Sequence, residues 1–266
     1  MSAPSAATTE PAVGRAPILQ ARGISKRFAG ITALNDVDMA VAPGELVGLI
    51  GPNGAGKTTF FNCLLGMLRP ESGVVIFDGR DITGLPVYKR ARLGIGRTFQ
   101  RLELFSGMTV REHFLVTERA RRGTGRLWKD LLNLSKPTKD EQALAEQMIE
   151  LTGLQREADL TVESLSLGRG RLVELGRALM TQPKLLLLDE PSSGLDVRET
   201  AGLADKLAAV QAEREFAVLL VEHDVEMVSS LVTRLYVLDF GELIASGRTA
   251  AVLGDEEVRR AYLGDM

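Results

Sequence analysis

The stretch "ELVGLIGPNGAGKTTFFNCLLGML", residues 45–68, decides the fold of this chain. It begins with a short apolar run that ends in glycine, residues 45–51, which is typical of a buried β-strand. Apolar residues at helical spacing follow over residues 57–68. The loop "GPNGAGKTT", residues 51–59, satisfies G-x-x-x-x-G-K-[ST], and it has the strand before it and the helix after it that this motif requires. We therefore predict a phosphate-binding loop (P-loop) in an α/β fold.

The residue types of this loop suit a nucleoside triphosphate. Glycines let backbone N–H groups close around a phosphate, because a Cβ would obstruct the approach. Lys57 supplies a positive charge for the β- and γ-phosphates of ATP, and Thr58 supplies a hydroxyl ligand for Mg²⁺. The predicted nucleotide-binding residues are Gly51, Pro52, Asn53, Gly54, Ala55, Gly56, Lys57, Thr58 and Thr59.

A second apolar run, "LLLLDEP" at residues 185–191, supplies two carboxylates. Its four leucines predict a buried strand, and ligands of open α/β sheets bind beyond the carboxyl ends of the strands. We expect Asp189 to bind in the coordination shell of Mg²⁺ and Glu190 to reach a water that attacks the nucleotide. Two adjacent acids at a buried strand end are costly unless they have such a task.

The rest of the chain alternates between strands and helices. We predict antiparallel strands at 18–28 and 31–41 and further strands at 73–79, 184–190, 216–223 and 234–239. We predict helices at 197–213 and 224–231, followed by a terminal hairpin and short helices. This alternation implies a largely parallel sheet. The middle of the chain instead contains helical segments around 109–120 and 138–152, which suggests a helical subdomain inserted into the sheet-based core.

The predicted organisation is thus a disordered leader at residues 1–17 and one domain at 18–266, with the helical subdomain at roughly 86–180. The leader is rich in Ala, Ser, Thr and Pro and lacks the apolar stretch of a secretion signal. The chain has 266 residues, a net charge of −3 and a single cysteine, Cys63. These values disfavour nucleic acid as a partner and fit a reducing, cytoplasmic compartment. The apolar runs are far shorter than the roughly 20 residues that span a bilayer.

A further glycine-rich stretch, "LSLGRGRLVELGRALM" at residues 165–180, also runs into an amphipathic helix. The N–H groups and the dipole at a helix N-terminus favour an anion. Taken alone, this stretch is an ordinary capped helix. A chain that already has a P-loop would need a reason for a second phosphate-binding segment.

With these motifs in order, the chain resembles the ATP-binding subunits of ABC transporters over nearly all of residues 18–263. Residues 51–59 match Walker A, and residues 185–190 match Walker B. The other matches are Gln100 in "GRTFQ" to the Q-loop glutamine, Asp196 in "SSGLD" (192–196) to the D-loop, His223 in "VEHD" to the switch histidine, and Phe28 in "KRFAG" to the aromatic that stacks on adenine. Residues 165–171, "LSLGRGR", stand where this family has its signature.

The resemblance explains the second phosphate segment. In the family two such domains dimerise head to tail, and each ATP lies between the Walker A of one subunit and the signature of the other. Ser166 and Gly168 would bind the partner's γ-phosphate. Leu167 and Arg169 depart from the usual Leu-Ser-Gly-Gly-Gln. Arg169 replaces the glutamine, and it either reinforces anion binding or faces a neighbouring carboxylate.

The resemblance also implies Mg²⁺-dependent hydrolysis of ATP with Glu190 as general base. Lys57 and, in trans, Ser166 would stabilise the developing charge. His223 would contact the γ-phosphate, and Gln100 would bind Mg²⁺ and the water and relay to the helical subdomain. Simpler interpretations remain for single residues: a surface glutamine at Gln100 or a core aromatic at Phe28.

Within the family, residues 94–114, the insertion before residue 138 and the ending "RRAYLGDM" resemble the ATPases of branched-chain amino acid importers. Such systems typically pair two different ATPase subunits with two permease chains and a soluble binding protein. We therefore expect this chain in a homo- or heterodimer of ATPase subunits at the cytoplasmic face of the membrane. The alternatives are the ATPase of a urea-uptake or lipopolysaccharide-export system, a soluble P-loop kinase, and a non-transport relative in translation or DNA repair.

Two features stay open in the predicted helical subdomain. His113 has no evident partner in the sequence and is either a surface residue or part of subdomain packing. The basic run 119–129, with Trp128, is either a solvated insertion or a contact for lipid headgroups or a partner.

Overall fold

The computed structural model describes residues 16–98, 103–122 and 137–263. The chain divides into two compact units. The first comprises Met1–Ile95, Lys184–Glu190 and Arg214–Met266, and the second comprises Gly96–Pro183 and Pro191–Glu213.

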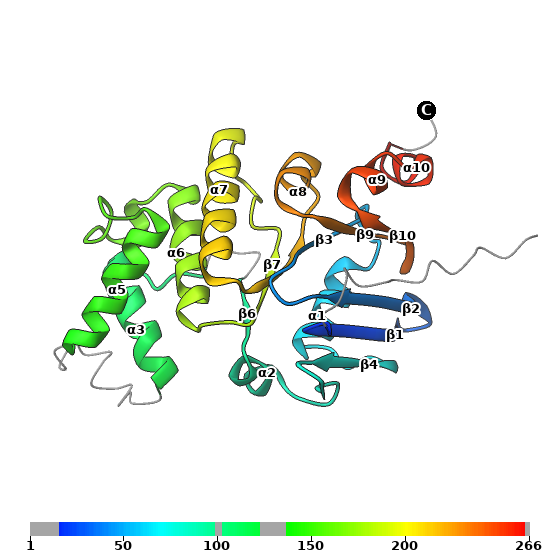
Figure 1. Ribbon diagram of the computed structural model, residues 1–266, viewed down its shortest axis with the longest axis horizontal. Helices are drawn as coiled ribbons and strands as arrows, with labels where there is room; N and C mark the ends of the chain where they lie inside the picture. Colours follow the sequence, from blue (N-terminus) through cyan, green and yellow to red (C-terminus); the bar gives the residue numbers. More distant parts are fainter. Residues whose placement is uncertain (1–15, 99–102, 123–136, 264–266) are drawn as a thin grey trace, which may run out of the picture. The chain divides into compact units, whose positions relative to one another are not determined.

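The first unit contains a small antiparallel sheet built from the first part of the chain (Figure 1). Its strands are β1 (Leu19–Phe28), β2 (Ile31–Val41), β4 (Ser72–Phe77) and β5 (Arg80–Asp81), in the order β2-β1-β4-β5. Leu19 of β1 lies opposite Val41 on one side and Phe77 on the other, and all three are buried. Alternation of apolar and polar residues along β1 thus places one face of this sheet in the core.

The main sheet of this unit is mostly parallel. Its strands are β10 (Glu242–Arg248), β9 (Arg234–Asp239), β3 (Leu46–Ile50), β8 (Ala217–Val221) and β7 (Leu185–Asp189), in that order, and β6 (Ile95–Arg97), where the chain passes to the second unit, is the sixth strand. β3 is parallel to β8 and β9, and β7 is parallel to β8, whereas β10 is antiparallel to β9. The carboxyl ends of β3, β7 and β8 therefore meet at one edge of the sheet.

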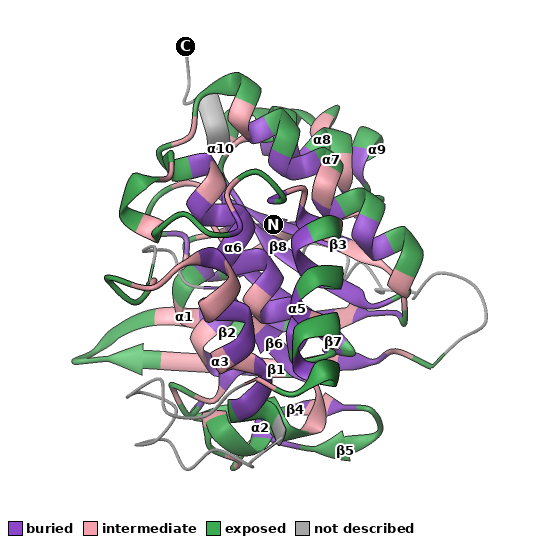
Figure 2. Cartoon of the chain, turned by 90° about the vertical axis from the view of Figure 1, so that its left-hand side faces the viewer, coloured by how far each residue is buried: buried purple, intermediate pink, exposed green. Residues whose placement is uncertain are grey.

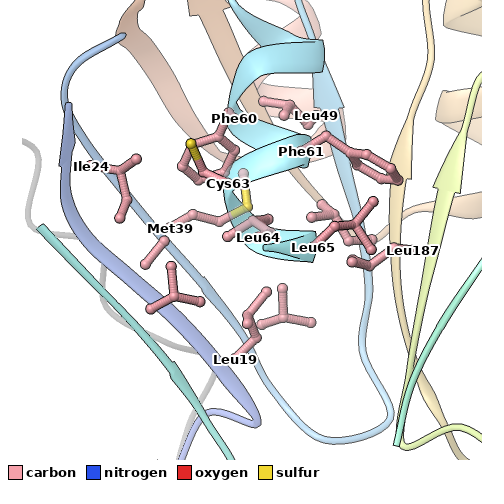
Figure 3. Packing of buried hydrophobic residues seen from close by; sticks show 14 of the residues in the cluster. Leu19, Ile24, Met39, Leu49, Phe60, Phe61, Cys63, Leu64, Leu65 and Leu187 are labelled. Atoms are coloured by element: carbon pink, nitrogen blue, oxygen red, sulfur yellow. The ribbon is translucent and has the colours of Figure 1, made fainter. Parts of the chain in front are cut away.

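Five helices of the described residues belong to the first unit. They are α1 (Lys57–Leu65), α2 (Val87–Leu93), α8 (Val225–Leu231), α9 (Thr249–Leu253) and α10 (Glu256–Leu263). The core gathers around α1, whose side chains Phe60, Cys63 and Leu64 are fully buried among residues of both sheets (Figure 3). Ile24 and Met39 come from the antiparallel sheet. This packing fixes the helix that the P-loop enters.

The second unit is helical. Its elements are α3 (Val110–Arg122), α5 (Lys139–Thr152), the short 3₁₀ helix η1 (Val162–Ser164), α6 (Leu167–Met180) and α7 (Val197–Arg214) up to Glu213. Helices α3, α5 and α6 pack against one another. α5 exposes a polar face and buries an apolar one, whereas α6 is buried along nearly its whole length (Figure 2). A capping box of Thr138 and Glu141 starts α5, which explains why the helix begins there.

The predicted α/β fold, with its antiparallel subdomain and mostly parallel main sheet, is confirmed. The strands β5 and β6 and the helices α2 and η1 were not predicted as separate elements. Residues 1–15 of the predicted leader lie outside the described residues, and the bounds 86–180 of the helical subdomain stay a prediction. No helix in the described ranges is long and apolar enough to cross a membrane.

His113 belongs to the packing of the second unit, so its interpretation as a surface residue is wrong. Its side chain is 1% exposed. Nε2 accepts the N–H of Phe105 at 2.9 Å, and Nδ1 lies 2.9 Å from the carbonyl oxygen of Thr109. The sequence did not reveal these partners because both are backbone groups that only the fold brings to the ring.

Candidate functional site

The P-loop connects β3 to α1 in the first unit and encloses the lysine side chain. Lys57 is 6% exposed, and its Nζ donates to the carbonyl oxygens of Gly51 at 2.6 Å and Pro52 at 3.0 Å. A Cβ at Gly51 would lie 2.1 Å from the carbonyl oxygen of Leu238, so no other residue fits there. The loop is therefore wrapped around an ammonium group at the N-terminus of a helix, where an anion is favoured.

Lys57 interacts electrostatically with the two carboxylates at the end of β7, Asp189 and Glu190. Burial lowers the pKa of Lys57, and the charges of Glu190 and Asp189 act in the opposite direction. Both carboxylates thus lie within electrostatic range of the ammonium, as the sequence predicted from the two strand ends.

Glu190 occupies a strained position directly after β7. Its φ is +46°, in the left-handed region that non-glycine residues seldom adopt. Its N–H donates to the carbonyl oxygen of Val221 at 2.9 Å, which continues the pairing of β7 with β8 by one residue. Strain of this kind clusters at functional sites, where the surrounding structure enforces it.

His223 follows β8 at the same edge of the sheet. Its Nδ1 lies 4.0 Å from Oε1 of Glu190 and 3.8 Å from Oε2 of Glu222. The imidazole is 57% exposed, whereas Glu222 is fully buried and accepts the N–H of His223 at 3.1 Å. The fold thus brings Lys57, Asp189, Glu190 and His223 together in one unit.

Glu222 is a residue of this site that the sequence analysis missed. A glutamate at the end of an apolar strand such as "FAVLLVE" is the signal that could have found it, because carboxylates are rarely buried without a task.

The residues around the loop suit a nucleotide with Mg²⁺. Pro52–Ala55 line a pocket of about 600 Å³ together with Asp239 and Phe240 of the β9–β10 turn and Glu257 and Arg260 of α10. In the described part of the chain, no group of three or more His, Cys, Asp or Glu residues could hold a metal by itself. Mg²⁺ in nucleotide sites is held by one or two protein groups plus phosphate oxygens, which fits the exposed Thr58 and the Asp189 carboxylate.

The second glycine-rich segment lies in the second unit, at the start of α6. Ser166 is the N-cap residue, and its Oγ accepts the N–H of Arg169 at 3.3 Å. A Cβ at Gly194 of the predicted D-loop would lie 2.9 Å from Cδ2 of Leu167, so the two loops are in contact within this unit. Asp196 accepts the N–H of Glu199 at 2.8 Å and so fixes the start of α7.

Arg169 faces carboxylate and carbonyl groups of its own chain, which settles one of the alternatives left open. Its Nη1 donates to the carbonyl oxygen of Gly153 at 3.1 Å, and its Nε lies 3.3 Å from Oε1 of Glu157. The side chain that replaces the usual signature glutamine thus joins the first turn of α6 to the end of α5.

Phe28 lies in the described part of the chain, whereas Gln100 and Trp128 do not. Phe28, at the end of β1, is 44% exposed, and Nζ of Lys26 lies 5.4 Å from its ring centroid, so its ring is not part of the core. Its contact with adenine stays a prediction. Gln100 lies outside the described residues, as do Trp128 and residues 123–129 of the basic run.

Comparisons with known proteins bear on the whole chain. The model of the family described as "ABC transporter" matches residues 34–193, and that of the "Branched-chain amino acid ATP-binding cassette transporter" matches residues 242–266.

Similar chains are known from several bacteria. The High-affinity branched-chain amino acid transport ATP-binding protein LivG of Escherichia coli is 39% identical over 94% of this chain and 98% of its own length. The Lipopolysaccharide export system ATP-binding protein LptB of Haemophilus influenzae is 35% identical over 93% of this chain and 98% of its own.

A solved structure supports the fold directly. The ADP conformation of MJ1267, an ATP-binding cassette of an ABC transporter, superposes with a TM-score of 0.81 at 32% identity and covers 94% of this chain and 100% of its own.

Proposed function

The chain belongs to the ABC transporter family and is an ATP-binding, ATP-hydrolysing subunit of such a transporter, and from this premise we propose that it energises the uptake of branched-chain amino acids. The observation that carries the substrate class is the match of residues 242–266 to the branched-chain family model. The higher identity to LivG than to LptB points the same way.

The proposed ATP site is built from the first unit. The P-loop N–H groups and Lys57 would bind the β- and γ-phosphates, while Phe28 would stack on the adenine. Thr58 and Asp189, with Gln100, would hold Mg²⁺. The bound ion supplies charge neutralisation for the phosphate oxygens.

Glu190 is the proposed general base. Its carboxylate lies at the strand end beside the imidazole of His223, and it would take the proton of the water that attacks the γ-phosphate. His223, whose side chain is 57% exposed, would contact the same phosphate group. Lys57 would stabilise the charge that develops on the phosphate oxygens.

The signature loop would complete the site of a second ATPase subunit. Ser166 is exposed and Leu167 is 39% exposed at the N-terminus of α6, as a segment that meets a partner requires. In this arrangement two subunits, identical or homologous, bind head to tail, and Ser166 and Gly168 close on the γ-phosphate held by the Lys57 of the other. Asp196 would lie in the same interface.

ABC transporter ATPases generally dimerise and associate with permease subunits. We place this chain at the cytoplasmic face of the membrane, bound to two permease chains that receive amino acids from a binding protein. Closure of the dimer around ATP and its reopening after hydrolysis would drive the permease between its two orientations.

The test is uptake in cells of the source organism whose own copy carries Glu190→Gln. We expect uptake of labelled leucine, isoleucine and valine to fall to the background of a deletion strain. Glu226→Gln, which changes an exposed carboxylate on α8, is the matched control and should leave uptake unchanged. Normal uptake of the three amino acids in the Glu190→Gln strain would contradict the proposed substrate class. Impaired lipopolysaccharide export or urea uptake in the same strain would then identify the substrate.

A further inference from the structure

The signature serine is already hydrogen-bonded within its own chain. The Ser166 hydroxyl donates to Oε1 of Glu199 at 3.0 Å, and Oγ of Ser166 accepts the N–H of Arg169 at 3.3 Å. A serine hydroxyl has a single proton. It therefore cannot donate to Glu199 and to a phosphate oxygen at the same time.

The position of Glu199 follows from the two loops that meet beside it. Asp196 anchors the first turn of α7, on which Glu199 lies, and the glutamate side chain extends over Gly168. A Cβ at position 168 would lie 2.8 Å from Oε1 and 2.9 Å from Cδ of Glu199. The carboxylate reaches Ser166 across Gly168 because this residue has no side chain.

A second side chain of the signature loop also makes contacts within this unit. Arg169 binds Glu157 and the carbonyl of Gly153, so its charge is directed toward the end of α5. A phosphate oxygen that accepts the Ser166 hydroxyl must therefore replace Glu199 in the Ser166–Glu199 hydrogen bond.

We propose that Glu199 is a positioning residue that holds the Ser166 hydroxyl in the ATP-free state and competes with the γ-phosphate for it. The proposal rests on the proposed function, in which Ser166 donates to ATP bound by a second subunit. A hydrogen bond to a charged acceptor is about twice as strong as one to a neutral acceptor, so the carboxylate holds the hydroxyl more firmly than an amide would. It therefore raises the ATP concentration at which the shared site closes.

The test is steady-state ATP hydrolysis by the membrane complex purified through a tag on this chain. Glu199→Gln keeps an oxygen acceptor but removes the charge. We expect KM for ATP to fall about two- to fivefold, the effect of one partly exposed charge, with little change in kcat. Asp205→Asn removes an exposed carboxylate from the same helix and should leave KM unchanged.

The same assay with Ser166→Ala separates the two hypotheses. The proposed function requires that Ser166→Ala alone lowers kcat/KM, and no effect of this variant would contradict that function. The role of Glu199 requires, in addition, that the fall in KM disappears when Glu199→Gln is combined with Ser166→Ala. A fall that persists in the double variant, or an unchanged or raised KM in Glu199→Gln alone, would overturn the role of Glu199 and leave the proposed function intact.

A further variant keeps the test decisive. Should Glu199→Gln fail to fold, as judged by its thermal unfolding midpoint, Glu199→Ala also removes the charge and must show the same fall in KM.

Discussion

Oε1 of Glu190 and Nδ1 of His223 lie 4.0 Å apart, on residues that follow two neighbouring parallel strands. The strand pairing brings the two side chains together, because β7 and β8 are in register up to Asp189 and Val221, which are one residue before Glu190 and two residues before His223. A carboxylate and an imidazole are thus placed at one edge of the sheet, where ligands of α/β folds bind. This relationship underlies the hydrolytic roles that we propose for both residues.

The first prediction concerns the general base. Glu190→Gln keeps the shape of the side chain but removes its basicity, so kcat for ATP should fall by about 10²–10⁴. ATP binding should persist, because the P-loop is unchanged. Steady-state phosphate release and equilibrium ATP binding measure the two effects. Glu226→Gln is the control, and a Glu190→Gln variant with normal turnover would remove Glu190 from this role.

The second prediction concerns the ammonium inside the P-loop. Lys57→Met should lower ATP affinity about 10- to 100-fold, because a charge-assisted hydrogen bond to phosphate is lost. Binding of a fluorescent ATP analogue measures the loss. Lys89→Met, an exposed lysine on α2 of the same unit, should bind as the wild type does. Equal ATP affinities of the two variants would contradict the role of Lys57 in phosphate binding.

A third prediction concerns Arg90, which is 1% exposed. Its guanidinium donates to the carbonyl oxygens of Cys63 and Leu64 at the end of α1 and of Thr83 and Leu85. Arg90→Met would leave these carbonyls without their donor, so we expect the free energy of unfolding to fall by about 3 kcal/mol.

Arg92→Met is the matched control for Arg90→Met. Arg92 lies two residues further along α2 and is exposed, and its guanidinium lies 5.8 Å from the ring centroid of the exposed Tyr88. Its loss should cost less than about 0.5 kcal/mol. Denaturant unfolding of both variants measures the difference, and equal costs would show that the Arg90 hydrogen bonds do not stabilise α1.

The fourth prediction concerns pH. Burial lowers the pKa of His113, and the Phe105 N–H requires an unprotonated Nε2. The unfolded chain takes up a proton near the ordinary pKa of about 6.5, whereas the folded chain does so only at lower pH. The free energy of unfolding should therefore decrease as the pH falls from 7 toward 5.

The variant His113→Gln tests this linkage. It should be less stable than the wild type at pH 8 but should lose less stability between pH 7 and pH 5. Denaturant unfolding at several pH values measures the slope. Identical slopes in the two proteins would show that another group carries the pH dependence.

The sequence predicted the strands around the site well because each is a continuous apolar run with a distinctive end. "GLIGPNGAGK" places Lys57 after the loop that follows β3, and "LLLLDE" places Asp189 and Glu190 at the end of β7. Parallel pairing through β8 then brings these segments to one edge of the sheet. Arg169 was undecided, because its partners Gly153 and Glu157 lie in the turn that follows another helix, α5. Glu199 was overlooked for a related reason: only the fold brings the first turn of α7 beside Ser166.

The short elements were harder to predict than the long ones. β5 has two residues and α2 has seven, so neither has a hydrophobic period long enough to recognise. The partners of Arg90 are backbone carbonyls, and every residue has one, so the sequence does not show which of them accept its hydrogen bonds.

The most direct measurement is a structure of the membrane complex carrying Glu190→Gln, trapped with ATP and Mg²⁺. The shared-site account predicts the Ser166 hydroxyl within hydrogen-bonding distance of a γ-phosphate that the P-loop of the second ATPase subunit holds, and released from Glu199. A bound ATP with Ser166 facing solvent and still donating to Glu199 would contradict it.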